Sequence, residues 1–114
     1  MAIFKTFGEY LTEASTGVVF TFGRFNPPTV GHEKLLDVVA KAAKGGDEYR
    51  VYSSQSQDKK KNPLDYNSKI KYMRKMFPRH ARSIVSDKSI KTALDALVKL
   101  YDDGFTKVSM VVGS

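Results

Sequence analysis

Cysteine is absent from the 114 residues, so neither a disulfide nor a thiolate metal site can form. No apolar run approaches the roughly 20 residues that a membrane-spanning helix needs. The first residues also lack the long apolar stretch of a secretory signal, although the chain begins with Met1. These absences predict a protein that is made and kept in the cytoplasm and that has no membrane partner.

Acidic residues are scarce in one part of the chain. The net charge is +7, and nine Lys and Arg residues but only two Asp residues lie between Asp58 and Arg82. Such a block favours polyanions: a nucleoside triphosphate, a phosphorylated small molecule or nucleic acid. A solvated basic face is the other interpretation, and composition leaves both open.

The chain is long enough for one small domain with a real core. Apolar periodicity predicts strands at 18–22, 49–53, 82–86 and 107–112, and helices at 33–44, 67–77 and 88–102. The order β-α-β-α-β-α-β implies an α/β fold with a Rossmann-like parallel sheet. The last strand is expected to be buried, and since the chain stops directly after it, we expect a domain truncated there.

One segment, from Gly23 to His32, indicates chemistry. It follows the apolar run 18–22 and reads Gly-Arg-Phe-Asn-Pro-Pro-Thr-Val-Gly-His before the first predicted helix. Helix N-termini attract phosphates through unpaired N–H groups and the positive end of the helix dipole. Thr29 and His32 are three residues apart and would share one face, while Gly31 leaves room for a close phosphate. The segment therefore predicts a phosphate-binding corner at the end of the first strand, where ligands bind in open parallel sheets.

These residues resemble the (His/Thr)-x-Gly-His signature of the nucleotidylyltransferase superfamily, which includes nicotinamide mononucleotide adenylyltransferases, phosphopantetheine adenylyltransferases and cytidylyltransferases. Two weaker matches follow in the expected order: the loop 60–64 with the helix start at 66–70, and Val111-Val112-Gly113-Ser114. The resemblance spans residues 18–114. It implies transfer of a nucleotide from ATP or CTP to a small phosphorylated acceptor, with release of pyrophosphate.

The resemblance also implies roles for individual residues. His32 and Thr29 would be catalytic, His32 donating to phosphate oxygens and Thr29 bonding a phosphate through its hydroxyl. The other implied contacts are nucleotide binding by Gly23, Arg24, Phe25, Asn26, Gly31 and Gly113, and binding of the acceptor's phosphate by Lys60, Lys61 and Lys69. No His, Asp or Glu cluster has metal-ligand spacing, so Mg²⁺ is expected to arrive with the nucleotide. His80 is interpreted as a surface residue without a role.

Two other functions stay open. The superfamily has a second signature, similar to Ile-Ser-Ser-Thr with a following Arg or Lys, and these 114 residues hold no match to it. This favours a rival hypothesis, a catalytically incomplete protein that binds nucleotides or nucleic acid and is packaged in a phage head. A fragment of a class I aminoacyl-tRNA synthetase is a third, less favoured reading. The choice between ATP and CTP, the acceptor and the oligomeric state are also left open.

The first 17 residues form a separate amphipathic leader in this interpretation, and residues 18–114 form the α/β domain. Leu11-Thr12-Glu13-Ala14 is similar to the cleavage site of capsid-targeting leaders in large tailed phages. Cleavage after Glu13 would place the mature protein inside a virion. An N-terminal helix packed on the sheet is the alternative.

Overall fold

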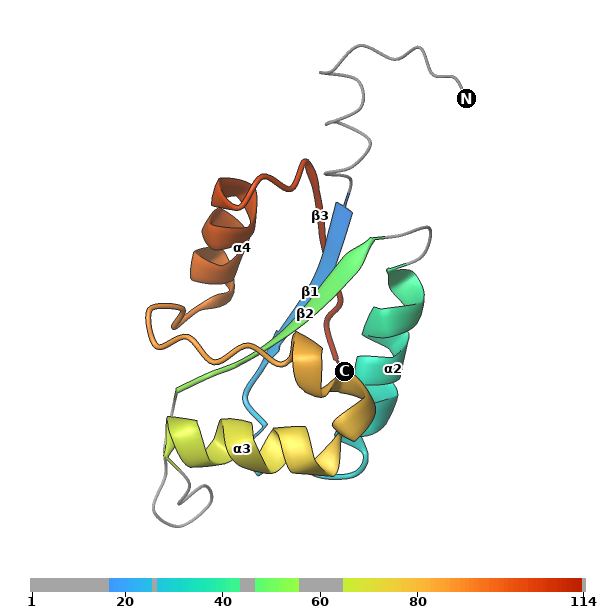
Figure 1. Cartoon of the computed structure of the whole chain (residues 1–114), viewed down its shortest axis with the longest axis vertical. Coiled ribbons are helices and arrows are strands. Elements are labelled where there is room, and N and C mark those ends of the chain that lie inside the picture. Colours follow the sequence, from blue (N-terminus) through green and yellow to red (C-terminus); the bar gives the residue numbers. More distant parts are fainter. Residues whose placement is uncertain (1–16, 26, 44–46, 56–64, 114) are drawn as a thin grey trace.

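In the described part of the chain, three parallel strands form a sheet, and the first of these strands in the sequence lies in the middle. The computed structural model describes residues 17–25, 27–43, 47–55 and 65–113. Strand β1 (Gly17–Gly23) pairs with β2 (Glu48–Ser53) on one side and with β3 (Lys107–Met110) on the other, which gives the order β2-β1-β3 (Figure 1). The expected α/β class with a Rossmann-like parallel sheet is confirmed.

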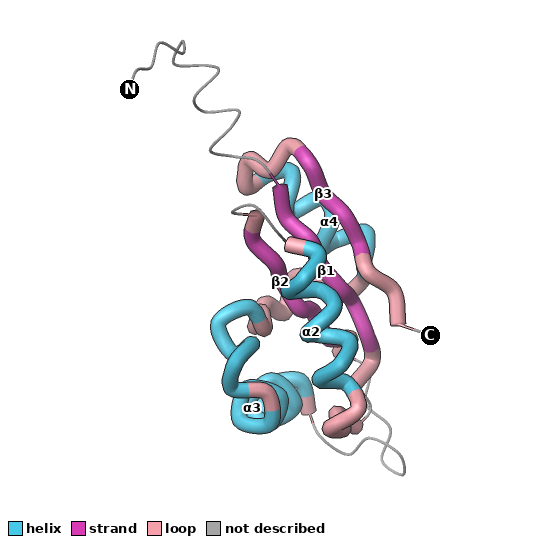
Figure 2. The backbone as a smooth tube through the Cα atoms, turned by 90° about the vertical axis from the view of Figure 1, so that its right-hand side faces the viewer, coloured by secondary structure: helices cyan, strands magenta, loops and turns pink. Residues whose placement is uncertain are grey.

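Helices cover both faces of this sheet. Helix α2 (His32–Ala42) lies on one face and α4 (Ala93–Asp102) on the other, as the two views in Figures 1 and 2 show. Helix α3 (Tyr66–Met76) and the 3-10 helix η1 (Pro78–Ser83) lie toward the end where β1 and β2 finish (Figure 1). The layered arrangement follows from the alternating element order.

The period-2 alternation of the strands divides the core into two clusters. On β1, Val18 and Phe20 face α4 and pack with Tyr52, Ile90 and Leu100. On the other face, Val51 lies among apolar side chains of α2, of α3 and of the residues on either side of η1. That second cluster comprises Phe25, Leu36, Val51, Tyr66, Ile70, Met73, Phe77 and Ile84. The end of α3 is therefore core, as the sequence predicted for Met73 and Phe77.

The strand expected at 82–86 is not formed. Pro78 opens the 3-10 helix, which continues to Ser83. Beyond it, Ile84 makes only an isolated parallel bridge to Val51. The guanidinium of Arg74 donates to the Ile84 carbonyl at 2.6 Å, so this carbonyl is bound to α3 instead of a neighbouring strand.

Two further expectations about the second half of the chain are corrected. The last strand was expected to be buried, but Met110 is 42% exposed, because β3 is an edge strand with only β1 beside it among the described residues. The last helix starts at Ala93 instead of residue 88. Thr92 and Asp95 form a capping box there, which ends the preceding loop and starts the helix.

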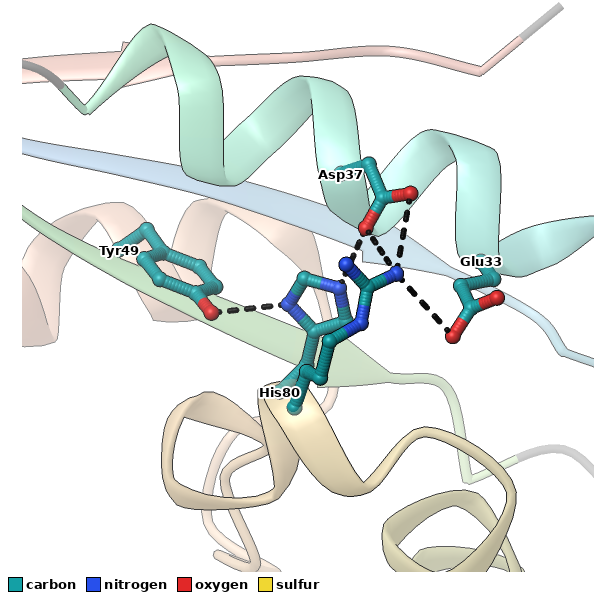
Figure 3. A network of polar contacts seen from close by, with 5 residues as sticks. Glu33, Asp37, Tyr49 and His80 are labelled. Atoms are coloured by element: carbon teal, nitrogen blue, oxygen red, sulfur yellow. Dashed lines mark hydrogen bonds and ion pairs between the residues drawn. The ribbon is translucent and has the colours of Figure 1, made fainter.

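His80 is buried, contrary to the expectation of a surface residue. It is 4% exposed, because the 3-10 helix turns it toward β2 and α2. Its Nδ1 lies 2.8 Å from the Tyr49 hydroxyl and its Nε2 lies 2.8 Å from Oδ1 of Asp37 (Figure 3). Arg79 adds ion pairs to Asp37 at 3.1 Å and to Glu33 at 3.4 Å. The network joins η1 and β2 to α2 and so fixes the helix that carries His32.

In the part of the chain that the structure describes, no helix is long and apolar enough to cross a membrane. The predicted leader and its cleavage site after Glu13 lie outside the described residues.

The network predicts a pH-dependent contribution of Asp37 to stability. The hydrogen bond from His80, helped by the charge of Arg79, lowers the pKa of the Asp37 carboxyl. A lowered pKa in the folded state stabilises the fold above the carboxyl's unfolded pKa of about 3.9, and this contribution is lost as the pH falls through the folded pKa. We expect Asp37→Asn to be less stable than the parent at pH 7 and the difference to shrink below pH 4, in urea unfolding followed by circular dichroism.

Asp102→Asn, at the exposed end of α4, controls for the loss of a surface carboxylate. An Asp37→Asn deficit that stays constant from pH 7 to pH 3 would contradict the account.

Candidate functional site

The turn after β1 is shaped by an unusual residue. Phe25 has a positive φ of 48°, which is rare for a bulky side chain. A residue keeps such a backbone conformation only where the surrounding contacts hold it. Its ring is buried and stacks edge-on against the imidazole of His32, with 4.9 Å between the centroids. A Cβ on Gly23 would come within 3.0 Å of this ring. Glycine at position 23 thus lets the Phe25 ring fold back under the turn.

His32 is held in one tautomer. The backbone N–H of Thr29 donates to Nδ1 of His32 at 2.9 Å, and the Thr29 hydroxyl lies 3.3 Å from the same atom. Because a backbone N–H only donates, Nδ1 must be the unprotonated nitrogen and Nε2 carries the proton. Nε2 has no hydrogen-bond partner within the described residues, so its N–H is available to a ligand.

Burial also lowers the pKa of the His32 imidazole below its usual 6.5, because desolvation disfavours the charged form. The residue is therefore a neutral donor at pH 7. The four residues from Thr29 to His32, which lead into α2, build this donor locally.

Two carbonyls of the turn are fixed from the side of β2 and α3. The Gly23 carbonyl accepts from the Ser54 N–H at 2.8 Å, and the Arg24 carbonyl accepts from Nζ of Lys69 at 2.9 Å. In a trans peptide the carbonyl and the following N–H point in opposite directions. The N–H groups of Arg24 and Phe25 therefore point away from these partners, and that of Arg24 points to the β3 side of the turn.

A cleft of about 540 Å³ lies on that β3 side. It is bordered by the end of β1, the start of α2 and the segment that follows β3. The lining residues are Thr21, Phe22, Gly23, Arg24, Phe25, Gly31, His32, Lys34, Leu35, Val38, Val111, Val112 and Gly113. They include the cations Arg24 and Lys34 but no carboxylate. The cleft lies where the connections from β1 and β2 diverge, which is the place for a ligand in such a sheet.

The start of α2 is less open than a bare helix end. The N–H groups of His32, Glu33 and Lys34 are bonded to carbonyls of residues 29–31, at 2.9, 3.1 and 3.3 Å. Among the described residues, the N–H groups of Val30 and Gly31 have no hydrogen-bond partner. These two groups and the helix dipole remain for an anion.

The structure brings most predicted site residues together. Gly23, Arg24, Phe25, Gly31, His32 and Gly113 all line the cleft. Thr29 lies beside it and holds His32. Asn26, Lys60 and Lys61 lie outside the described residues.

Lys69 does not lie in the cleft. It is fully buried, and its ammonium donates to the carbonyls of Arg24 and Ser54 at 2.9 and 3.0 Å. This arrangement indicates that it supports the turn, whereas the predicted contact with an acceptor's phosphate stays a prediction.

Sequence reasoning missed Lys34 and Thr21. Lys34 lines the cleft on the exposed side of the first turn of α2. Its position two residues after His32 could have indicated from the sequence that it belongs to the site. The Thr21 hydroxyl donates to the Val111 carbonyl at 2.8 Å. It ties β1 to the segment after β3 and so shapes the cleft wall, which no local pattern could have shown.

Within the described residues, no group of three or more His, Cys, Asp or Glu side chains could hold a metal ion. The described residues that line the cleft likewise include no carboxylate.

One match to a protein-family profile decides the family of this chain. A family profile described as cytidylyltransferase-like matches residues 20–113, from β1 to the glycine at the cleft edge. The chain belongs to the cytidylyltransferase-like family. Comparisons with curated proteins and with solved structures gave no match. The expected membership of the nucleotidylyltransferase superfamily is confirmed, and the cytidylyltransferase-like domain contains the whole cleft.

The geometry of the cytidylyltransferase-like site predicts the state of His32. Its imidazole should titrate below pH 6.5 and should carry its neutral proton on Nε2, since Nδ1 accepts from the Thr29 N–H. Long-range ¹⁵N–¹H correlation spectra across a pH series measure both properties. His80 provides an internal reference in the same spectra. A neutral His32 with its proton on Nδ1, or a pKa above 6.5, would show that the turn is arranged differently.

Proposed function

We propose that this protein is a nucleotidyltransferase that binds ATP or CTP in the cleft and transfers the nucleotide to a small phosphorylated acceptor. The observation that carries the proposal is the His32 Nε2–H, which Thr29 fixes as the protonated nitrogen of a residue that lines the cleft. The described lining residues include two cations and no carboxylate. Membership of the cytidylyltransferase-like family supports nucleotidyl transfer in general.

The triphosphate fits the end of the cleft formed by the turn and by α2. The cations Arg24 and Lys34 neutralise its charge, and the N–H groups of Val30 and Gly31 and the dipole of α2 add further attraction. Leu35 and Val38 supply an apolar wall for the nucleoside. A Cβ on Gly113 would come within 3.3 Å of the Leu35 side chain, so a glycine lets the two walls approach closely.

The reaction needs no nucleophile from the protein. An oxygen of the acceptor's phosphate attacks the α-phosphorus, the bond from this phosphorus to the bridging oxygen of the β-phosphate breaks, and pyrophosphate leaves with the bonding electrons. His32 donates its Nε2–H to a phosphate oxygen as negative charge builds up on it. Catalysis then comes from positioning and from electrostatic stabilisation.

Thr29 acts as a positioning residue in this proposal. Its N–H holds the imidazole by Nδ1, and its hydroxyl lies 3.3 Å from the same nitrogen. We propose that this hydroxyl also bonds a phosphate of the nucleotide. Binding of the acceptor's phosphate by Lys60, Lys61 and Lys69 stays a prediction from the resemblance.

Mg²⁺ is the cofactor that the superfamily implies. The described cleft residues offer it no carboxylate ligand, so it would be held by oxygens of the triphosphate. Bound there, it would supply further neutralisation of the phosphate charge.

The first test is pyrophosphate release by the 114-residue chain from ATP or CTP in the presence of phosphorylated acceptors. We expect His32→Ala to lower the rate by about 100-fold or more, as the loss of one preorganised donor does elsewhere. His32→Gln keeps a donor near the same place and should retain more activity. Tight binding of either triphosphate without any release of pyrophosphate would contradict transfer and favour the catalytically incomplete alternative.

Lys34 provides a second test that separates binding from chemistry. Lys34→Gln should weaken binding of the triphosphate by about tenfold, because it removes one charge-assisted hydrogen bond. Lys41→Gln, at the far end of the same helix, is the matched control and should change nothing. Equal effects of the two substitutions in calorimetric titrations would mean that the triphosphate does not lie at the start of α2.

A further inference from the structure

The positive charge of the chain is concentrated on α3 and η1. Residues 66–86 contain six Lys and Arg residues and no Asp or Glu. One of the six, Lys69, is buried beneath the turn after β1, and the other five are exposed. Arg79 is neutralised by Glu33 and Asp37, so the uncompensated charge lies mainly along α3.

The exposed face of α3 carries an aromatic ring beside two cations. We call Lys71, Tyr72 and Lys75 the α3 stripe; all three are exposed, and Tyr72 has 47% of its surface accessible. Lys71 and Lys75 are one helical turn apart, about 6 Å along the axis. Within the described residues neither lysine pairs with a carboxylate. Arg74 flanks the stripe, with one of its nitrogens bonded to the Ile84 carbonyl.

The opposite face of α3 holds the stripe in place. Ile70 and Met73 are 2% and 0% exposed in the cluster that also contains Phe25. Asp65 caps the helix by accepting from the Ser68 N–H at 2.7 Å. The helix that carries the stripe is therefore anchored at its start and along its buried side.

We propose that the α3 stripe binds single-stranded nucleic acid. Lys71, Lys75 and Arg74 contact successive phosphates, and a base stacks on the ring of Tyr72. Cations that follow the backbone beside an exposed aromatic ring are the combination by which single strands are bound without sequence preference. A surface for a plain polyanion would need no exposed ring. This activity is separate from nucleotidyl transfer, because it uses none of the residues that line the cleft.

Fluorescence anisotropy with labelled 12-nucleotide oligo(dT) and oligo(U) tests the proposal, with salt varied from 50 to 200 mM. Two phosphate contacts contribute roughly −1.4 to the slope of log K against log salt for a single strand. The Lys71→Gln/Lys75→Gln variant should lose about that much of the slope. Tyr72→Ala should weaken binding by roughly five- to a hundred-fold, the range for loss of one stacked base.

Matched controls separate this surface from the cleft and from overall charge. Lys41→Gln/Lys107→Gln removes the same charge from exposed positions outside α3 and should bind as the parent does. His32→Ala should also bind the oligonucleotides unchanged, whatever it does to pyrophosphate release. An abasic strand of the same length should bind as weakly to the parent as oligo(dT) does to Tyr72→Ala.

Each other outcome overturns the proposal. Equal binding of abasic and normal strands would show a general polyanion surface. Loss of oligonucleotide binding in His32→Ala, or competition by a saturating triphosphate, would show that the oligonucleotide binds in the cleft. Absence of binding at 50 mM salt would leave the stripe as a solvated face.

Discussion

The buried ammonium of Lys69 is the interaction on which the site depends. Removing a charged group from water is costly, and the burial lowers the pKa of the Lys69 ammonium. It persists because it donates to the Arg24 and Ser54 carbonyls, where β1 and β2 end. With these carbonyls held, the N–H group that follows Arg24 must point the other way. A lysine on α3 thus sets the direction of the peptide group that follows Arg24, which lies 45 residues earlier in the chain.

The other half of the site depends on the position of α2. The Tyr49–His80–Asp37 network fixes this helix against β2 and η1, and the Phe25 ring supports the imidazole at its start. His32 and the cations Arg24 and Lys34 then line one cleft. Backbone geometry, a fixed tautomer and charge of one sign are together what nucleotidyl transfer requires.

A feature could be predicted from the sequence where the contacts that determine it lie between residues close together in the chain. The turn from Gly23 to His32 was predicted because its residues are contiguous, and the helices because their apolar faces repeat. His80 was misplaced because its partners come from α2 and β2, about 40 and 30 residues away. The predicted strand at 82–86 does not form, because Arg74 binds the Ile84 carbonyl. The orientation of Lys69 depends on the Arg24 carbonyl, which lies in the turn after β1, far away in the sequence.

Binding of a nucleotide's triphosphate in the cleft beside His32 is best tested by titrating the ¹⁵N-labelled protein with CTP and with ATP. We expect the largest chemical-shift changes on the amides of Arg24, Phe25, Val30 and Gly31 and on Nε2 of His32. Changes confined to α3, or no changes at millimolar nucleotide, would contradict binding in the cleft.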